Sequence, residues 1–157
     1  MKKILLGACL TVTSTVLVAL VILRMGLVPV SADGTHSRLE ARIMPVVLHA
    51  AVSRQALSTK TRPAMSEEAR QSGLHAYKAL CATCHGTFNG QPSEYGQAFY
   101  PPAPTLSQGL QGYTDEEIFW IIKHGIRNTG MPAWSGALSD DEIWQVVAVL
   151  KRPGNDK

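Results

Sequence analysis

Cysteine is scarce in this sequence, and its scarcity excludes several kinds of site. The chain has three cysteines in 157 residues. Cys81 and Cys84 stand three positions apart, and Cys9 lies far from both. A structural zinc site needs four ligands, and the sequence offers no second cysteine pair to complete one.

Other chemistry is missing as well. The sequence shows no serine–histidine–aspartate or paired-carboxylate arrangement, so it predicts no enzyme. Residues 66–157 hold seven basic and ten acidic side chains and therefore carry a net charge of −3. A nucleic-acid-binding domain needs a basic patch on the folded part of the chain. We therefore expect no nucleic-acid partner.

The sequence does contain the box Cys81-Ala82-Thr83-Cys84-His85. Cys-x-x-Cys-His is the spacing of covalent haem c attachment. Residues three apart lie on one face of a helix end, so both thiols can meet the same haem edge. His85 then presents its imidazole to the iron. A redox-active dithiol is the other interpretation, but it does not require this histidine. We expect one haem c, held by Cys81, Cys84 and His85.

The amino end is long and apolar. Lys2 and Lys3 precede an apolar run over residues 4–23. Twenty helical residues span about 30 Å, the thickness of a bilayer core, whereas the apolar region of a cleaved signal is usually shorter. The length favours a retained transmembrane anchor over residues 1–32. Cleavage after Ala32, in the small-residue stretch Val30-Ser31-Ala32, is the alternative, and Cys9 is interpreted as a buried thiol.

The positive charges at the amino end predict the topology. Short segments rich in lysine or arginine stay in the cytoplasm, so Lys2 and Lys3 place the rest of the chain across the membrane. We expect a bacterial inner-membrane protein whose haem domain faces the periplasm.

Residues 33–65 are predicted to be a juxtamembrane stalk and linker. A helical apolar pattern runs from His36 to Leu57, and Pro45 is expected to kink or divide it. The other face of this segment is basic. It either lies against anionic headgroups or forms a solvated stalk.

Residues 66–157 are predicted to be a small all-α haem domain. Ser66 starts a helix that runs to the cysteine box, and Thr114-x-x-Glu117 and Ser139-x-x-Glu142 are capping boxes that start two more. The second helix should end near Gly125, and the last before Pro153. The stretch between Gly86 and Tyr113 is rich in turn residues, and we expect it to wrap the haem in place of a protein core.

The pattern from about Ser66 to Arg152 resembles a class I c-type cytochrome. Gly73 and Tyr77 stand where this family places a glycine and an aromatic residue for the close crossing of its first and last helices. Pro104-Thr105-Leu106 is similar to the family's Pro-x-Leu, and the resemblance implies that the Pro104 carbonyl accepts a hydrogen bond from His85. Gly130-Met131-Pro132-Ala133-Trp134 resembles the axial-methionine loop. Val149 departs from the family, which often has an aromatic residue there.

The sixth iron ligand is predicted to be Met131. A glycine and a proline flank it in a non-helical loop, which is a poor setting for a core methionine. The other candidates weighed are Met44, Met65, His36, His49, His75 and His124. Trp134 and Tyr100 are expected to cover the haem edge, to bind a propionate, or simply to belong to the core.

With both axial positions filled, the sequence predicts a single-electron carrier that serves redox partners in or at the membrane. One alternative is a haem-bearing subunit of an oxidase or dehydrogenase complex. A peroxidase-type enzyme is the other, and it requires an open iron position.

Overall fold

The computed structural model describes residues 1–28, 30–33, 37–61, 63–88 and 90–151. Every regular element in these ranges is helical, as the sequence predicts. The chain forms two compact units, the first ending at Ser31 and the second starting at Ala32.

The first unit consists of α1 (Lys2–Arg24), a helix long and apolar enough to cross a membrane. None of its residues is buried within the structure. This is the element expected of an anchor, and a signal sequence has the same character.

The second unit begins with α2 (Arg38–Gln55) and the 3₁₀ turn η1 (Ala56–Ser58). The helix continues through Pro45, so the division predicted there is wrong. A proline removes one backbone hydrogen bond, and the remaining turns of this 18-residue helix hold it together. The carboxyl-terminal part of α2 packs on α7, where Val52 and Ala56 are buried. His36 lies outside the described residues.

The cysteine box lies at the end of an irregular helix. Ser66 caps α3 (Glu67–Ala76) through a hydrogen bond from the Ala69 amide. The π-helical turn η2 (Tyr77–Cys81) and the short α4 (Ala82–His85) follow directly. Such π turns widen a helix locally and frequently occur at functional sites.

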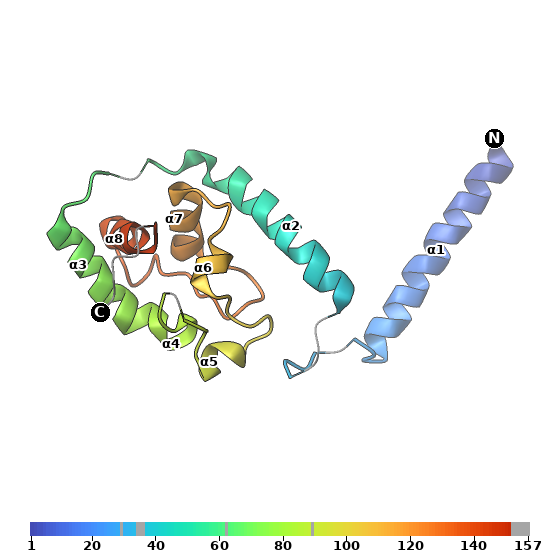
Figure 1. The fold of residues 1–157 in the computed structure, drawn as a ribbon. Coiled ribbons are helices and arrows are strands. Elements are labelled where there is room, and N and C mark those ends of the chain that lie inside the picture. The colour runs from blue at the N-terminus through green and yellow to red at the C-terminus, as the bar shows by residue number, and fades with distance from the viewer. Residues whose placement is uncertain (29, 34–36, 62, 89, 152–157) are drawn as a thin grey trace. The chain divides into compact units, whose positions relative to one another are not determined.

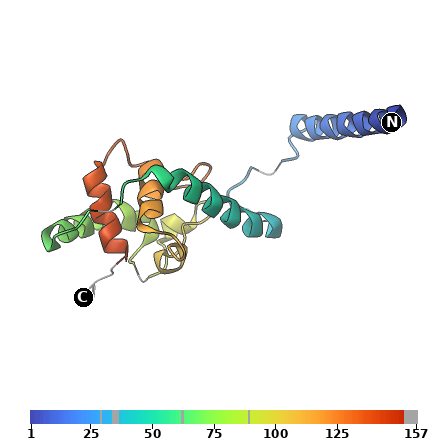
Figure 2. The same cartoon turned by 90° about the horizontal axis from the view of Figure 1, so that it is seen from above.

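Two further helices complete the core of the second unit (Figures 1 and 2). Both predicted capping boxes are present, at the starts of α7 (Asp115–His124) and α8 (Asp140–Lys151). The α7 helix ends at Gly125, whose φ of 66° lies in the region that favours glycine. Pro153, predicted to stop the last helix, lies outside the described residues.

The first and last helices of this unit cross closely, as the glycine and aromatic pattern implies. A Cβ on Gly73 would lie 2.2 Å from the backbone oxygen of Gln145 in α8. Around this crossing Tyr77, Ile143, Val146 and Val147 are buried. Val149 is also buried, and the aromatic contact in this region is instead the stacked pair Phe119–Trp144, with ring centres 4.3 Å apart.

The segment between the box and α7 is mostly loop. It contains two single-turn helices that the sequence pattern does not predict, α5 (Glu94–Gln97) and α6 (Leu106–Gly109). Ser93 caps α5 through a hydrogen bond from the Gly96 amide. Most of this segment borders a pocket.

Candidate functional site

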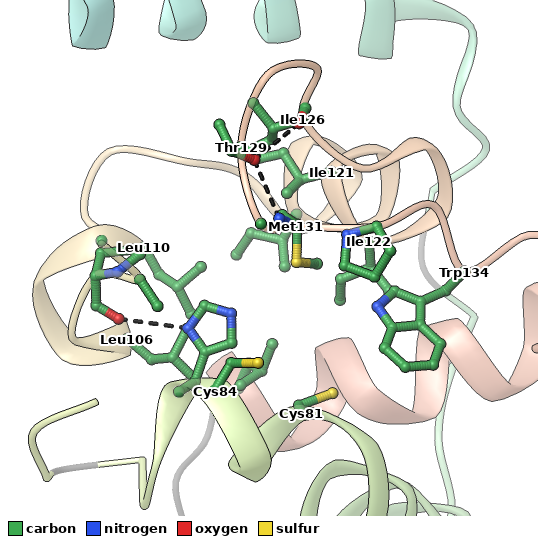
Figure 3. A pocket seen from close by; sticks show the side chains of 18 of the residues that line it. Cys81, Cys84, Leu106, Leu110, Ile121, Ile122, Ile126, Thr129, Met131 and Trp134 are labelled. Carbon is green, nitrogen blue, oxygen red and sulfur yellow. Dashed lines mark hydrogen bonds between the residues drawn. The ribbon is translucent and has the colours of Figure 1, made fainter. Parts of the chain in front are cut away.

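The second unit contains a large apolar pocket (Figure 3). Its walls come from the cysteine box and η2, the loop before α6, α7, the loop after α7, and α8. One lining residue, Leu48, comes from α2. Cys81 and Cys84 enter the pocket from one side and Met131 from the opposite side. The pocket therefore gathers the two thiols, the imidazole of His85 and the thioether around one space.

The turn after the cysteine box is held by backbone contacts. The buried Tyr77 hydroxyl donates a hydrogen bond of 2.9 Å to the Gly86 carbonyl. Gly86 has a φ of 67°, and a Cβ there would lie 2.3 Å from the Gln91 oxygen. The Ser93 amide donates to the Cys84 carbonyl over 3.1 Å. These contacts fix the box against the following loop.

His85 is oriented by the loop on the far side of the pocket. Its Nδ1 lies 3.4 Å from the Pro104 carbonyl oxygen. A carbonyl can only accept, so Nδ1 carries the hydrogen and Nε2 keeps a free lone pair. Burial lowers the pKa of His85, and the Pro104 contact opposes this only in part. The imidazole is thus kept neutral, which is the form that binds a metal.

Met131 is positioned by a tightly bonded loop. Its backbone amide donates to the Thr129 hydroxyl over 3.1 Å, and that hydroxyl donates to the Ile126 carbonyl over 2.8 Å (Figure 3). The Ile126 amide in turn donates to the Met131 carbonyl over 3.1 Å. At Gly130 a Cβ would lie 2.6 Å from the Phe99 ring, so only glycine permits this approach. The loop holds the thioether in the pocket.

These residues fit a covalently attached haem. The donor set is a neutral imidazole, a thioether and two thiols, and the remaining lining is almost entirely apolar, as a porphyrin requires. Burial and the nearby Cys84 raise the pKa of the Cys81 thiol to about 11. Redox-active cysteine pairs have lowered pKa values instead, so the dithiol interpretation finds no support. Among the described residues, no three His, Cys, Asp or Glu side chains are grouped to hold a metal ion.

The other candidate ligands lie elsewhere. The described ones are exposed or part of the packing, and none of them lines the pocket: Met44, His49 and His75 are exposed, His124 lies against Trp120 at the end of α7, and Met65 packs on the core. Trp134 lines the pocket. Tyr100 does not, and its hydroxyl donates a hydrogen bond of 2.8 Å to Glu40 of α2.

Sequence reasoning did not find two contributions to the site. The Thr129 hydroxyl braces Met131, and a threonine two residues before the methionine was the only available signal. Leu48 reaches the pocket from a helix that precedes the cysteine box by more than twenty residues. Its position on the inward face of an amphipathic helix gave no indication of which pocket that face would meet.

Known proteins share this arrangement. Cytochrome c6 of Tetradesmus obliquus is 37% identical over 87 residues, covering 54% of this chain and 92% of that protein. A chain of the Kuenenia stuttgartiensis reducing HAO-like protein complex Kustc0457/Kustc0458 aligns with a TM-score of 0.43 and 20% identity, over 57% of this chain and 46% of that one. The family described as "Cytochrome C oxidase, cbb3-type, subunit III" matches residues 68–149, slightly more than half of the 157 residues. The protein belongs to this family of class I c-type cytochromes and carries covalently bound haem c.

Proposed function

We propose that the protein is a periplasmic single-electron carrier with His85 and Met131 as the axial ligands of its haem iron. Bound haem c supplies an iron that takes up and releases one electron. The observation that carries the proposal is the placement of the Met131 thioether and the His85 imidazole around the same apolar pocket. With both positions filled, the iron offers no open site for a substrate.

The chain's own residues set the properties of the carrier. Pro104 holds the His85 tautomer, and the bonded loop through Thr129 keeps Met131 within the pocket. A thioether ligand favours a higher reduction potential than a second imidazole. The apolar lining excludes water, which reduces the reorganisation that accompanies a change of charge.

Replacing Met131 by histidine tests the ligation. We expect Met131→His to lower the reduction potential and to abolish the methionine–iron absorption of the oxidised protein, while the thioether bonds to Cys81 and Cys84 remain. Met44→His is the matched control, because Met44 is exposed on α2 and should leave the spectrum unchanged. A wild-type spectrum of bis-histidine type would contradict the assignment. Tight carbon monoxide binding by the ferrous protein, or steady peroxidase turnover, would contradict the carrier role.

A second function is favoured by the family description, which names an oxidase subunit. In that case the protein would pass electrons within a membrane complex rather than as a free carrier. Solubilisation in mild detergent distinguishes the two, since a subunit would migrate with other chains and a free carrier would migrate alone.

A further inference from the structure

We propose that α2 docks the haem domain on an anionic bilayer surface through its outward apolar face. The α2 stripe consists of Leu39, Ile43, Val46, Val47 and Ala50. The inference rests on the proposed periplasmic location beside the membrane.

The stripe has helical periodicity and no cover in the second unit. Its members recur at intervals of three and four residues, which places them along one side of the helix. Leu39 and Val46 are 66% and 69% exposed, and Ile43 and Val47 are 46% and 51% exposed. The amino-terminal part of α2 projects beyond the other helices of this unit (Figure 2). Leu57, in η1, is 84% exposed and continues the apolar surface.

The opposite side of α2 is already occupied. Val52 and Ala56 are buried against the rest of the unit, and Leu48 lines the haem pocket. The Ser53 hydroxyl donates a hydrogen bond to Glu117 in α7, and the His49 ring lies 4.9 Å from that of Tyr113. These contacts fix the rotation of the helix about its axis. The stripe therefore points away from the pocket and cannot turn inward to bury itself.

Charge selects an anionic surface as the occupant. Along α2 the exposed side chains Arg38, Arg42 and Arg54 stand against the single acid Glu40, giving the helix a net charge of +2. Glu40 also accepts the hydrogen bond from Tyr100. In contrast, residues 66–157 carry −3 and would be repelled by anionic headgroups. Arginine side chains can reach headgroups while the apolar residues beside them enter the interface.

Chain length selects the bilayer among apolar surfaces. Thirteen residues separate the end of α1 at Arg24 from the start of α2 at Arg38. Fully extended, they span about 45 Å at most. While α1 crosses the membrane, the start of α2 cannot leave the neighbourhood of the surface. The effective concentration of bilayer at the stripe is therefore high.

The test uses the full haem-loaded chain with a protease site inserted between Ser31 and Ala32, at the boundary of the two units. The protein is reconstituted in vesicles, cut, and the vesicles are floated. With phosphatidylglycerol present, we expect the released haem domain to float with the lipid. Retention on pure phosphatidylcholine should be about 30-fold weaker, because a basic residue near an anionic surface contributes about 1 kcal/mol and α2 has two in excess.

The variant Ile43→Glu/Val47→Glu should reduce retention about a hundredfold or more, because two apolar side chains leave the interface. Both positions are exposed, so an unchanged haem spectrum will report an intact fold. Gln108→Glu/Gln111→Glu adds the same charge at exposed positions away from α2 and should retain binding.

Three results would overturn the proposal. One is equal release of the wild type and the α2 variant, and another is equal retention on the two lipids. The third is a lipid-free dimer of the cut protein that Ile43→Glu/Val47→Glu dissociates, because it would assign the stripe to a second copy. A mature amino terminus at Asp33 would end the anchor hypothesis alone, and flotation of that shorter form would still test α2.

Discussion

At the scale of the residue, the carboxylate of Glu117 connects three parts of the second unit. It is only 7% exposed. It completes the capping box of α7 by accepting from the Thr114 amide over 2.8 Å, and it also accepts the Ser53 hydroxyl from α2. Burial alone would raise the pKa of Glu117, but these hydrogen bonds and the nearby His49 lower it below its ordinary value. The ionised form therefore holds α2 on α7.

The lowered pKa of Glu117 predicts a pH-dependent stability. A carboxyl group with a lower pKa in the folded state stabilises the fold fully above its unfolded pKa, and this contribution is lost as pH falls through the folded pKa. We expect Glu117→Gln to reduce the free energy of unfolding by about 1.5 kcal/mol at neutral pH, because a charge-assisted hydrogen bond becomes a neutral one. The difference from wild type should shrink in acid, below about pH 4.

Urea unfolding at the two pH values measures this. Glu116→Gln is the control, since it removes a charge from the same turn and leaves the Ser53–Glu117 pair in place. A constant difference between wild type and Glu117→Gln across the pH range would refute the role assigned to the carboxylate.

At the scale of the element, the crossing of α3 and α8 supports the pocket. Gly73 lets the two backbones touch, and η2 and α4 then carry the cysteine box away from the crossing. Tyr77, one turn later, is buried in the core and bonded to Gly86. The direction in which Cys81 and Cys84 leave α3 therefore depends on how closely α8 approaches.

Gly73→Ala should destabilise the haem domain. Alanine gains about 1 kcal/mol in helix propensity over glycine. However, its Cβ would lie 2.2 Å from the Gln145 backbone oxygen, and separating the helices costs about 3 kcal/mol. The clash dominates, so we expect a net loss of about 2 kcal/mol in the free energy of unfolding.

Denaturant unfolding followed by helical circular dichroism checks this value. Gly136→Ala is a matched control, because a Cβ there meets nothing within 4 Å. If Gly73→Ala were as stable as Gly136→Ala, the close crossing would not limit the fold.

At the scale of the whole molecule, charge is divided along the chain. Residues 1–32 contribute Lys2, Lys3 and Arg24 and no acid, while residues 66–157 carry −3. The basic part lies beside the proposed membrane span, and the acidic part contains the haem pocket. Such a domain should attract redox partners through a basic patch on their surface.

Small redox reagents test this polarity without knowledge of the partner. We expect oxidation of the reduced protein by a cationic cobalt(III) complex to slow several-fold as salt is raised, whereas oxidation by ferricyanide should accelerate, because salt screens attraction in one case and repulsion in the other. Stopped-flow absorbance of the haem gives both rates. Opposite salt slopes would contradict an acidic docking face.

The fate of α1 is a separate prediction. A run of this length favours a retained anchor over a cleaved signal. We expect the haem-stained mature protein to be found in the membrane fraction with Lys2 and Lys3 still attached, and intact-mass measurement shows this directly. A soluble protein that begins at Asp33 is the contrary result.

Local chemistry explains what the sequence determined by itself. The cysteine box, the caps at Ser66, Thr114 and Ser139, and the helix end at Gly125 involve residues a few positions apart, so their geometry hardly depends on the rest of the fold. The resemblance from Ser66 to Arg152 predicted the family and the haem, and the family match and the cytochrome c6 relative confirm both.

Only the tertiary structure decided where distant segments meet. The contact of Leu48 with the pocket, the Tyr100–Glu40 hydrogen bond and the Ser53–Glu117 pair join residues about 35 to 65 positions apart. An amphipathic pattern shows that α2 has an inward face, but not which helix receives it. That choice depends on the close packing of α7 and α8 around an apolar pocket, which long-range contacts establish.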